Sequence, residues 1–250
     1  MTRNVGRVIV MLVLAMPSAS AWAAHPFLTE DPGTQGKNHT ELELGFAADQ
    51  GDPTFGGRGL LFSPQISYGV AETVDFIVQG FWQSQSPAGA PTVRGIGNAL
   101  VDLKWRFYET KGPLALAVRA GVDLPTGDDA NGFGGGQPGA HLLAVAGWKY
   151  PDFSVYANAR YARVRQPGIR PNIGFFSVAV TAPEDAPLRT FIEAAAYSNT
   201  NPANAKWPAL ARTGVIHSVN AALDIDVGVQ ARLNTSATRF SWLAGATWHW

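Results

Sequence analysis

Apolar side chains recur at every second position in twelve segments of this chain, most of them about 10–12 residues long. In residues 223–233 the two alternating sets are Leu223, Ile225, Val227, Val229, Ala231 and Leu233 against Asp224, Asp226, Gly228, Gln230 and Arg232. Period-two alternation is the pattern of a β-strand with one apolar and one polar face. Convincing helical periodicity occurs nowhere in the sequence. The chain is therefore predicted to be all-β.

The lengths of the segments and of their connections indicate where such a sheet would lie. The predicted strands are 39–48, 59–70, 73–83, 97–108, 113–124, 140–149, 153–163, 172–182, 189–198, 209–219, 223–233 and 240–250. A tilted strand needs about 9–11 residues to cross a bilayer, whereas strands in soluble proteins average about 5–6. Short turns alternate with longer loops rich in Gly, Pro, Asn and Ser, which is typical of outer-membrane barrels with short periplasmic turns and long extracellular loops. Residues 38–250 are therefore predicted to form a twelve-stranded transmembrane antiparallel β-barrel in the outer membrane of a Gram-negative bacterium. A secreted β-sandwich would show the same alternation, but with shorter strands.

The first 23 residues have the features of an export signal. Arg3 and Arg7 precede an apolar run over 8–16, and small residues surround a cleavage site after Ala23. This order is that of a secretory signal peptide, and the apolar run is far shorter than the roughly 20 residues of a membrane-spanning helix. We predict that residues 1–23 are cleaved on export.

The next stretch, 24–37, is too polar and rich in turn residues to form a lipid-facing strand. It must lie in the periplasm or fold into the barrel. One hypothesis is that it plugs or gates the periplasmic mouth, with His25 near its start and Phe27 and Leu28 as its apolar anchor. The alternative is a mobile tail.

Aromatic residues mark the ends of the predicted strands. Phe240, Trp242, Trp248 and Trp250 share one face of the last strand. Amphipathic rings at both membrane interfaces are expected of transmembrane barrels, so lipid is a predicted partner. An aromatic final residue also resembles the C-terminal signal that barrel assembly machinery recognises, which makes that machinery a second predicted partner, through Trp250.

The polar face of the strands would line the barrel lumen. The predicted lumen or constriction residues are Asp102, Lys104, Arg106, Arg119, Arg160, Glu193, Arg212, Asp224, Asp226 and Arg232, and Glu41, Glu43, Gln65 and Asp123 share their parity. In one interpretation these acids and bases pair across strands in a solvated lumen. In the other, the arginines face Glu193, Asp224 and Asp226 across a constriction that orients small polar or anionic solutes. The sequence alone does not place these side chains at one depth.

Composition excludes several classes of site. There is no cysteine, so disulfides and thiolate metal sites are excluded. Nineteen basic residues balance nineteen acidic ones without a basic run, which argues against nucleic-acid binding. The five histidines have no partner at metal-ligand spacing, so no metal and no cofactor is predicted, and the chain is not expected to be an enzyme. Two alternatives to a channel remain: an outer-membrane lipid hydrolase using His217 with Ser218 or Ser177, and a structural barrel without flux.

Several motifs also match a known family. His25-Pro26 is followed by Glu30, Asp31 and the run Gly33 to Lys37, with Pro32 where threonine is expected, and by matching segments at 102–109, 124–128 and 224–234. In this order and spacing the sequence resembles the outer-membrane proteins of the meta-pathway of phenol degradation, often described as transporters. The resemblance implies a barrel that moves small molecules, aromatic or other hydrophobic organic compounds among them, across the outer membrane.

Overall fold

A computed structural model describes residues 25–53, 56–166 and 168–250, so the predicted signal peptide lies outside the described residues. The described part is built from β-strands and one short 3-10 helix, η1 (Asp129–Asn131). The strands are β1 (Thr40–Gln50), β2 (Arg58–Ala71), β3 (Val74–Gln79), β4 (Trp82–Ser86), β5 (Val93–Ile96), β6 (Leu100–Glu109), β7 (Leu114–Asp123), β8 (Gly139–Lys149), β9 (Ser154–Arg163), β10 (Asn172–Ala182), β11 (Leu188–Tyr197), β12 (Ala209–Asn220), β13 (Leu223–Arg232) and β14 (Phe240–His249).

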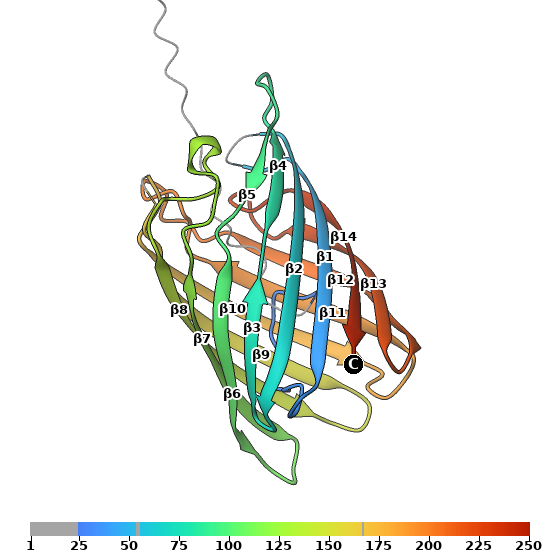
Figure 1. The fold of residues 1–250 in the computed structure, drawn as a ribbon. Helices are drawn as coiled ribbons and strands as arrows, with labels where there is room; N and C mark the ends of the chain where they lie inside the picture. The colour runs from blue at the N-terminus through green and yellow to red at the C-terminus, as the bar shows by residue number, and fades with distance from the viewer. Residues whose placement is uncertain (1–24, 54–55, 167) are drawn as a thin grey trace, which may run out of the picture.

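These strands form one closed barrel (Figure 1). Every neighbouring pair is antiparallel, and β1 closes the wall by pairing with both β2 and β14. β3 and β4 both pair with β2, so together they form one wall strand with an interruption. β5 pairs with β4 and β6 pairs with β3, so β5 and β6 together form the next wall strand, which is also interrupted. The fourteen strands therefore make a twelve-stranded wall, which confirms the predicted fold class.

The alternation of apolar and polar residues is confirmed as an outer and an inner face. Outward side chains such as Ile192 and Val227 are 62% and 57% exposed, whereas the inward Arg119 and Glu193 are each 1% exposed. A soluble protein would bury the first kind and expose the second. An apolar outer surface around a polar interior is the arrangement that a bilayer requires of a barrel. No helix in the described ranges is long and apolar enough to cross a membrane.

Two strands extend further than the alternation predicts. The sequence predicted strands at 73–83 and 97–108 with a loop between them, but β4 and β5 continue the wall as a hairpin on the long-loop side (Figure 1). Residues 83–86 read Gln-Ser-Gln-Ser and have no apolar face, so alternation gave no signal for them. The strand is interrupted at residues 97–99, where the backbone of Ala99 bonds to the loop after β7: the Leu124 amide donates to the Ala99 carbonyl at 2.8 Å, and the Ala99 amide donates to the Thr126 hydroxyl at 2.8 Å.

Candidate functional site in the barrel lumen

The segment 25–37 lies inside the barrel, against the inner faces of its strands (Figure 1). Leu28, Thr29 and Glu30 are 3%, 2% and 3% exposed. Leu28 packs with inward apolar side chains that include Phe175 and Leu210. Because the segment is not a strand, its backbone groups need other partners, and side chains of the wall supply them.

Phe27 and Leu28 hold the apolar part of the segment. The ring of Phe27 meets Phe191 of β11 edge to face, with centroids 4.7 Å apart. These are the two residues that the sequence suggested as an anchor, and the structure places both against the wall. Their role in gating stays a prediction.

Glu193 of β11 accepts several hydrogen bonds from the segment. The Leu28 amide donates to its two carboxylate oxygens at 2.9 and 3.0 Å, and the Thr29 amide and hydroxyl donate to Oε1 at 2.6 and 2.5 Å. Arg212 of β12 lies 4.0 Å from Glu193 and donates to the Pro26 carbonyl at 3.1 Å. Hydrogen bonds to a carboxylate are about twice as strong as neutral ones, so Glu193 fixes the segment at this depth.

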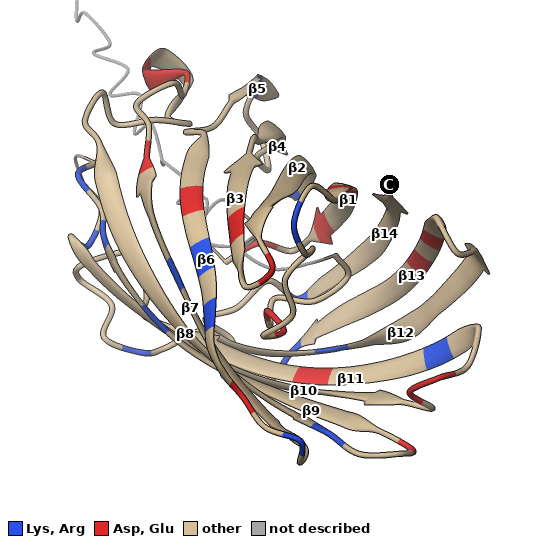
Figure 2. Ribbon diagram, turned by 60° about the horizontal axis from the view of Figure 1, so that its bottom comes forward, with Lys and Arg blue, Asp and Glu red and all other residues tan. Residues whose placement is uncertain are grey.

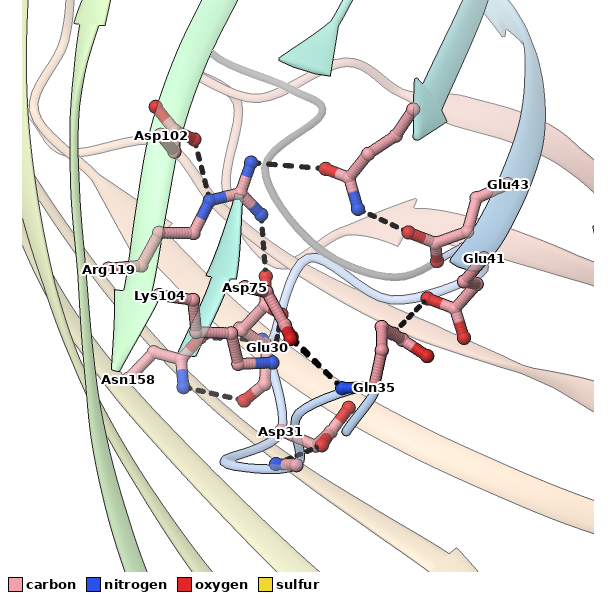
Figure 3. Close-up of polar contacts among 12 residues, drawn as sticks. Glu30, Asp31, Gln35, Glu41, Glu43, Asp75, Asp102, Lys104, Arg119 and Asn158 are labelled. Atoms are coloured by element: carbon pink, nitrogen blue, oxygen red, sulfur yellow. Dashed lines mark hydrogen bonds and ion pairs between the residues drawn. The ribbon is translucent and has the colours of Figure 1, made fainter. Parts of the chain in front are cut away.

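Glu30 is the centre of a second set of contacts (Figure 3). Its carboxylate meets Lys104 of β6 at 2.7 Å and Arg119 of β7 at 2.8 Å. The side-chain amide of Asn158 of β9 makes two hydrogen bonds to the backbone of Glu30. Its oxygen accepts from the Glu30 amide at 2.6 Å, and its nitrogen donates to the Glu30 carbonyl at 2.9 Å. We call Glu30, Lys104, Arg119, Asn158 and Asp102, which accepts from Arg119 Nε at 2.6 Å, the Glu30 cluster.

The charge balance of this cluster determines the protonation of Glu30. Burial by itself raises the pKa of its carboxyl, but Lys104 and Arg119 together outweigh burial and hold the pKa below its usual range. Glu30 is therefore ionised when docked, and the docked segment binds protons less readily than the released one.

A pH dependence follows from this shift. Above the ordinary value of 4.5 Glu30 is charged in both states, so its contribution to docking is complete. As the pH falls below that value and through the lowered pKa, protonation favours release. A thiol introduced at Ser177, which lies under Thr29, reports on release. Because the thiolate is the species that reacts with maleimide, its rate is divided by that of an exposed thiol at Ala88 at the same pH, and we expect this ratio to rise as the pH is lowered. Burial raises the pKa of Asp31, which acts in the opposite sense. Glu30→Gln is therefore the informative comparison: its corrected labelling should be fast and should not rise further as the pH falls.

Glycines of the wall make room for the segment. A Cβ at Gly45 of β1 or Gly245 of β14 would lie 2.5 or 2.1 Å from atoms of the His25 ring. At Gly147 of β8 it would lie 2.6 Å from Pro32, and at Gly69 of β2 it would meet the backbone of the segment itself. Glycine in a strand interior marks such close approaches. The inner wall is thus shaped to the segment at four separate strands.

Gly245→Ala tests this fit. The added methyl group cannot be accommodated unless His25 moves, and moving it breaks the 2.8 Å contact between His25 and Asp226. Overpacking costs about 1–3 kcal/mol, so we expect the maleimide reactivity of a Ser177→Cys reporter to rise about 5- to 100-fold. Because the chain contains no cysteine, this reporter is the only thiol. Gly80→Ala is the control, since its Cβ would meet nothing closer than 3.8 Å. Equal rates in the two variants would refute the fit.

The other predicted lumen residues do not gather at one depth. Asp224 pairs with Arg189 at 2.9 Å near the periplasmic mouth, and Arg106 meets Glu109 at 3.4 Å beside a periplasmic turn. Arg160 is buried on β9, whereas Arg232 is exposed beside the long loop after β13. Arg119 contacts Asp102 and Glu30 and does not face Glu193. The structure therefore divides the set between the Glu30 cluster, the pair of Glu193 with Arg212, and both rims, with Arg160 buried on β9 and Asp226 paired with His25 at 2.8 Å.

Sequence reasoning missed the residues that connect the segment to the wall. Thr29, Glu30 and Asn158 carry many of its polar contacts. Thr29 and Asn158 were not named, and Glu30 was named only as part of the family motif. The charge of Glu30 could have predicted its pairing. Glu30 is an acid in a segment that was suggested to enter the lumen, and Lys104 and Arg119 were already predicted to line that lumen. His141 was also missed; its ring nitrogens lie 2.9 Å from Asp102 and 2.9 Å from Asp123. Among the described residues no group of three or more His, Asp or Glu side chains is arranged to hold a metal ion.

Three cavities adjoin the segment, and two of them share His25 and Phe27 as lining residues. One, of about 340 Å³, opens at the periplasmic side and is lined by the segment and by β1, β3 and β13 among others. The second, of about 50 Å³, lies toward the long loops and is lined by Phe27, Leu28 and Arg212 among others. The segment thus narrows the bore between them.

Fold and lumen together define an outer-membrane β-barrel with a segment of its own chain inside. The chain belongs to the family described as "Putative MetA-pathway of phenol degradation", whose profile matches residues 23–250. None of the curated proteins compared with it matches its sequence.

Solved structures share the fold. An outer membrane channel from Pseudomonas putida F1 superposes with a TM-score of 0.68 at 11% identity, over 88% of this chain and 98% of that one. The NanC porin superposes at 0.58 with 9% identity, over 84% and 98%. The KdgM porin superposes at 0.59 with 9% identity, over 83% and 98%. At these identities the likeness concerns the fold alone.

Proposed function

We propose that the protein is a channel for passive or facilitated passage of small molecules across the outer membrane, gated by its segment 25–37. The observation that carries this proposal is a polar lumen in a twelve-stranded wall, narrowed by a segment that is bound inside it. A twelve-stranded barrel has a wider interior than the side-chain-filled bore of eight strands and a narrower one than porins of 16–18 strands. The family description and the channel and porin neighbours support the proposal, and the former favours aromatic or other hydrophobic organic permeants.

The way the segment is held supports a gate. Its contacts with the wall run through side chains such as Glu193, Lys104 and Asn158, while the strand pairing of β1 begins only at Thr40. Release would therefore leave every inter-strand ladder intact. A structural plug woven into the sheet would not have this property.

A lipid hydrolase is the main alternative, and the structure speaks against the residues suggested for it. His217 is exposed on the outer face of β12, whereas Ser177 is buried in the lumen and bonded to Thr29 at 2.8 Å. Ser218 follows His217 on the same strand and so points to the opposite face. Neither pair is placed for nucleophile and base to meet.

Swelling of proteoliposomes in isotonic small sugars tests the channel. We expect swelling with the intact mature chain, faster when residues 25–36 are deleted. A structural barrel predicts no swelling with either protein, and that result would overturn the proposal.

Two steps of biogenesis belong to the same proposal. Residues 1–23 would be removed on export, and barrel assembly machinery would recognise the end of the chain through Trp250. N-terminal sequencing of the protein from outer membranes tests the first, with Ala24 as the expected first residue.

A further inference from the structure

The periplasmic cavity of about 340 Å³, which we call the vestibule, has an excess of negative charge. Seven carboxylates line it, against one lysine and one arginine. Acidic positions on β1, β3 and β13 edge this mouth of the barrel in Figure 2. Both cations are already engaged, Lys104 by Glu30 at 2.7 Å and Arg189 by Asp224 at 2.9 Å.

Five of these carboxylates lack a Lys or Arg within ion-pair distance among the described residues. Asp226 meets His25 at 2.8 Å; the other four are Asp31, Glu41, Glu43 and Asp75. Amides serve as their donors instead. Gln35 donates to Asp75 through its backbone at 3.1 Å and to Glu41 through its side chain at 2.9 Å (Figure 3). The Gly33 amide donates to Asp31 at 2.6 Å, and His249 lies 3.0 Å from Glu41. Like charges confined in a low-dielectric cavity focus a potential that attracts cations.

Glu43 supplies an independent observation. It is 3% exposed, it lines the vestibule, and one of its carboxylate oxygens, Oε2, accepts from Gln65. The other oxygen, Oε1, is buried and has no hydrogen-bond partner. A buried acceptor left without a donor is costly, so this atom marks the place where a donor from outside the chain would fit.

Three apolar side chains, Phe27, Ile77 and Ile216, line the vestibule among polar ones such as Gln65 and Thr247. Its volume is at the lower end of the range of small-molecule sites, about 300–1,000 Å³. Carboxylates together with these three aromatic and aliphatic side chains match a small molecule with a cationic head and an apolar body. The absence of a metal-binding arrangement among the described side chains favours an organic cation over a metal ion.

We propose that the vestibule binds small organic ammonium ions, with the ammonium group donating to Glu43 Oε1 and lying between Glu43 and Glu41, and the apolar body against Phe27 and Ile216. This inference rests on the proposed channel function in one respect: it names the class of permeant that the channel would select.

Calorimetric titration of the detergent-solubilised full mature chain tests the site with three probes of one shape: benzylamine, benzyl alcohol and benzoate. At neutral pH the first is a cation, the second neutral and the third an anion. We expect benzylamine to bind at least about tenfold more tightly than either of the others, and Glu43→Gln to weaken it about tenfold, which corresponds to about 1.4 kcal/mol. Asp49→Asn is the matched control, because Asp49 lies on the same strand but lines the other cavity, and it should leave the affinity within about twofold.

Glu41→Gln serves as a second variant in case Glu43→Gln impairs folding, which heat-modifiable migration on gels reveals. Equal affinities for the three probes, or an unchanged affinity in the folded variants, would overturn the site. Sugar-induced swelling of liposomes containing the same proteins reports on the channel separately. Benzylamine binding without swelling would retain the site and reject the channel, and swelling without a preference for benzylamine would do the reverse.

Discussion

Deleting residues 25–36 raises the single-channel conductance of the barrel by about fivefold or more in planar bilayers, because the bore of a twelve-stranded wall is then free of its segment. In the intact chain this segment fills the lumen beside β1, β11 and β14, with Leu28, Thr29 and Glu30 almost fully buried. Its removal leaves water in place of protein across the narrowest part. The intact mature chain should show a small or intermittent conductance.

The deletion is a clean test because the barrel closes without the deleted residues. Thr40 and Trp250 exchange backbone hydrogen bonds of 2.7 and 2.9 Å, and the deletion ends before both. Circular dichroism and heat-modifiable migration should show the same barrel. Equal conductance of the two proteins would mean that the segment does not limit flow, and the gate would be abandoned.

Replacing Arg119 by methionine should release the segment without removing it. Arg119 is 1% exposed and contacts Glu30 at 2.8 Å, Asp102 at 2.6 Å and Gln65 at 3.0 Å. Breaking a buried ion pair by removing one partner costs about 3–5 kcal/mol. This loss of docking free energy is larger than the about 1–3 kcal/mol expected for Gly245→Ala. We expect the maleimide reactivity of a thiol at Ser177 to rise by about a hundredfold or more, and the conductance to approach that of the truncated protein.

Arg232→Met provides the control for this loss of charge. The same sequence reasoning placed both arginines in the lumen, but Arg232 is exposed at the end of β13. Its replacement should leave reactivity and conductance unchanged. If both substitutions had the same effect, net charge rather than the Glu30 cluster would be responsible. If Arg119→Met had none, the cluster would not hold the segment.

Alternation predicted most of the fold because a bilayer imposes one rule on every strand. Predicted strands such as 172–182 and 223–233 match β10 and β13 to within one residue at each end. The rule failed at β4 and β5, which extend beyond the lipid-facing pattern and have polar residues on both faces. Alternation also does not tell how deep in the barrel a residue lies. Arg119 and Arg232 were therefore both assigned to the lumen, although the first is buried in it and the second is exposed at its rim.

The candidate site was less predictable for a physical reason. Strand parity states which way a wall residue points, but the segment 25–37 has no period, and the partners of Glu30 come from three different strands. Asn158 carries no charge and differs in no visible way from other inward polar residues. The sequence also does not distinguish the wall glycines 45, 69, 147 and 245 from other glycines. Their importance depends on which atoms of the segment an added side chain would contact.

The segment proposed as a gate is covalently tethered to the barrel that it occupies. Residues 38 and 39 are all that separate the lumenal segment from β1, so a released segment would stay beside its site. Short tethers of this kind give effective concentrations in the millimolar range. Closing is then a first-order event that dilution does not slow, and a free peptide of the same sequence would need about millimolar concentration to compete for the lumen. In the proposed gate, opening would therefore be brief and fully reversible, and each barrel would be regulated independently of how many others share the membrane.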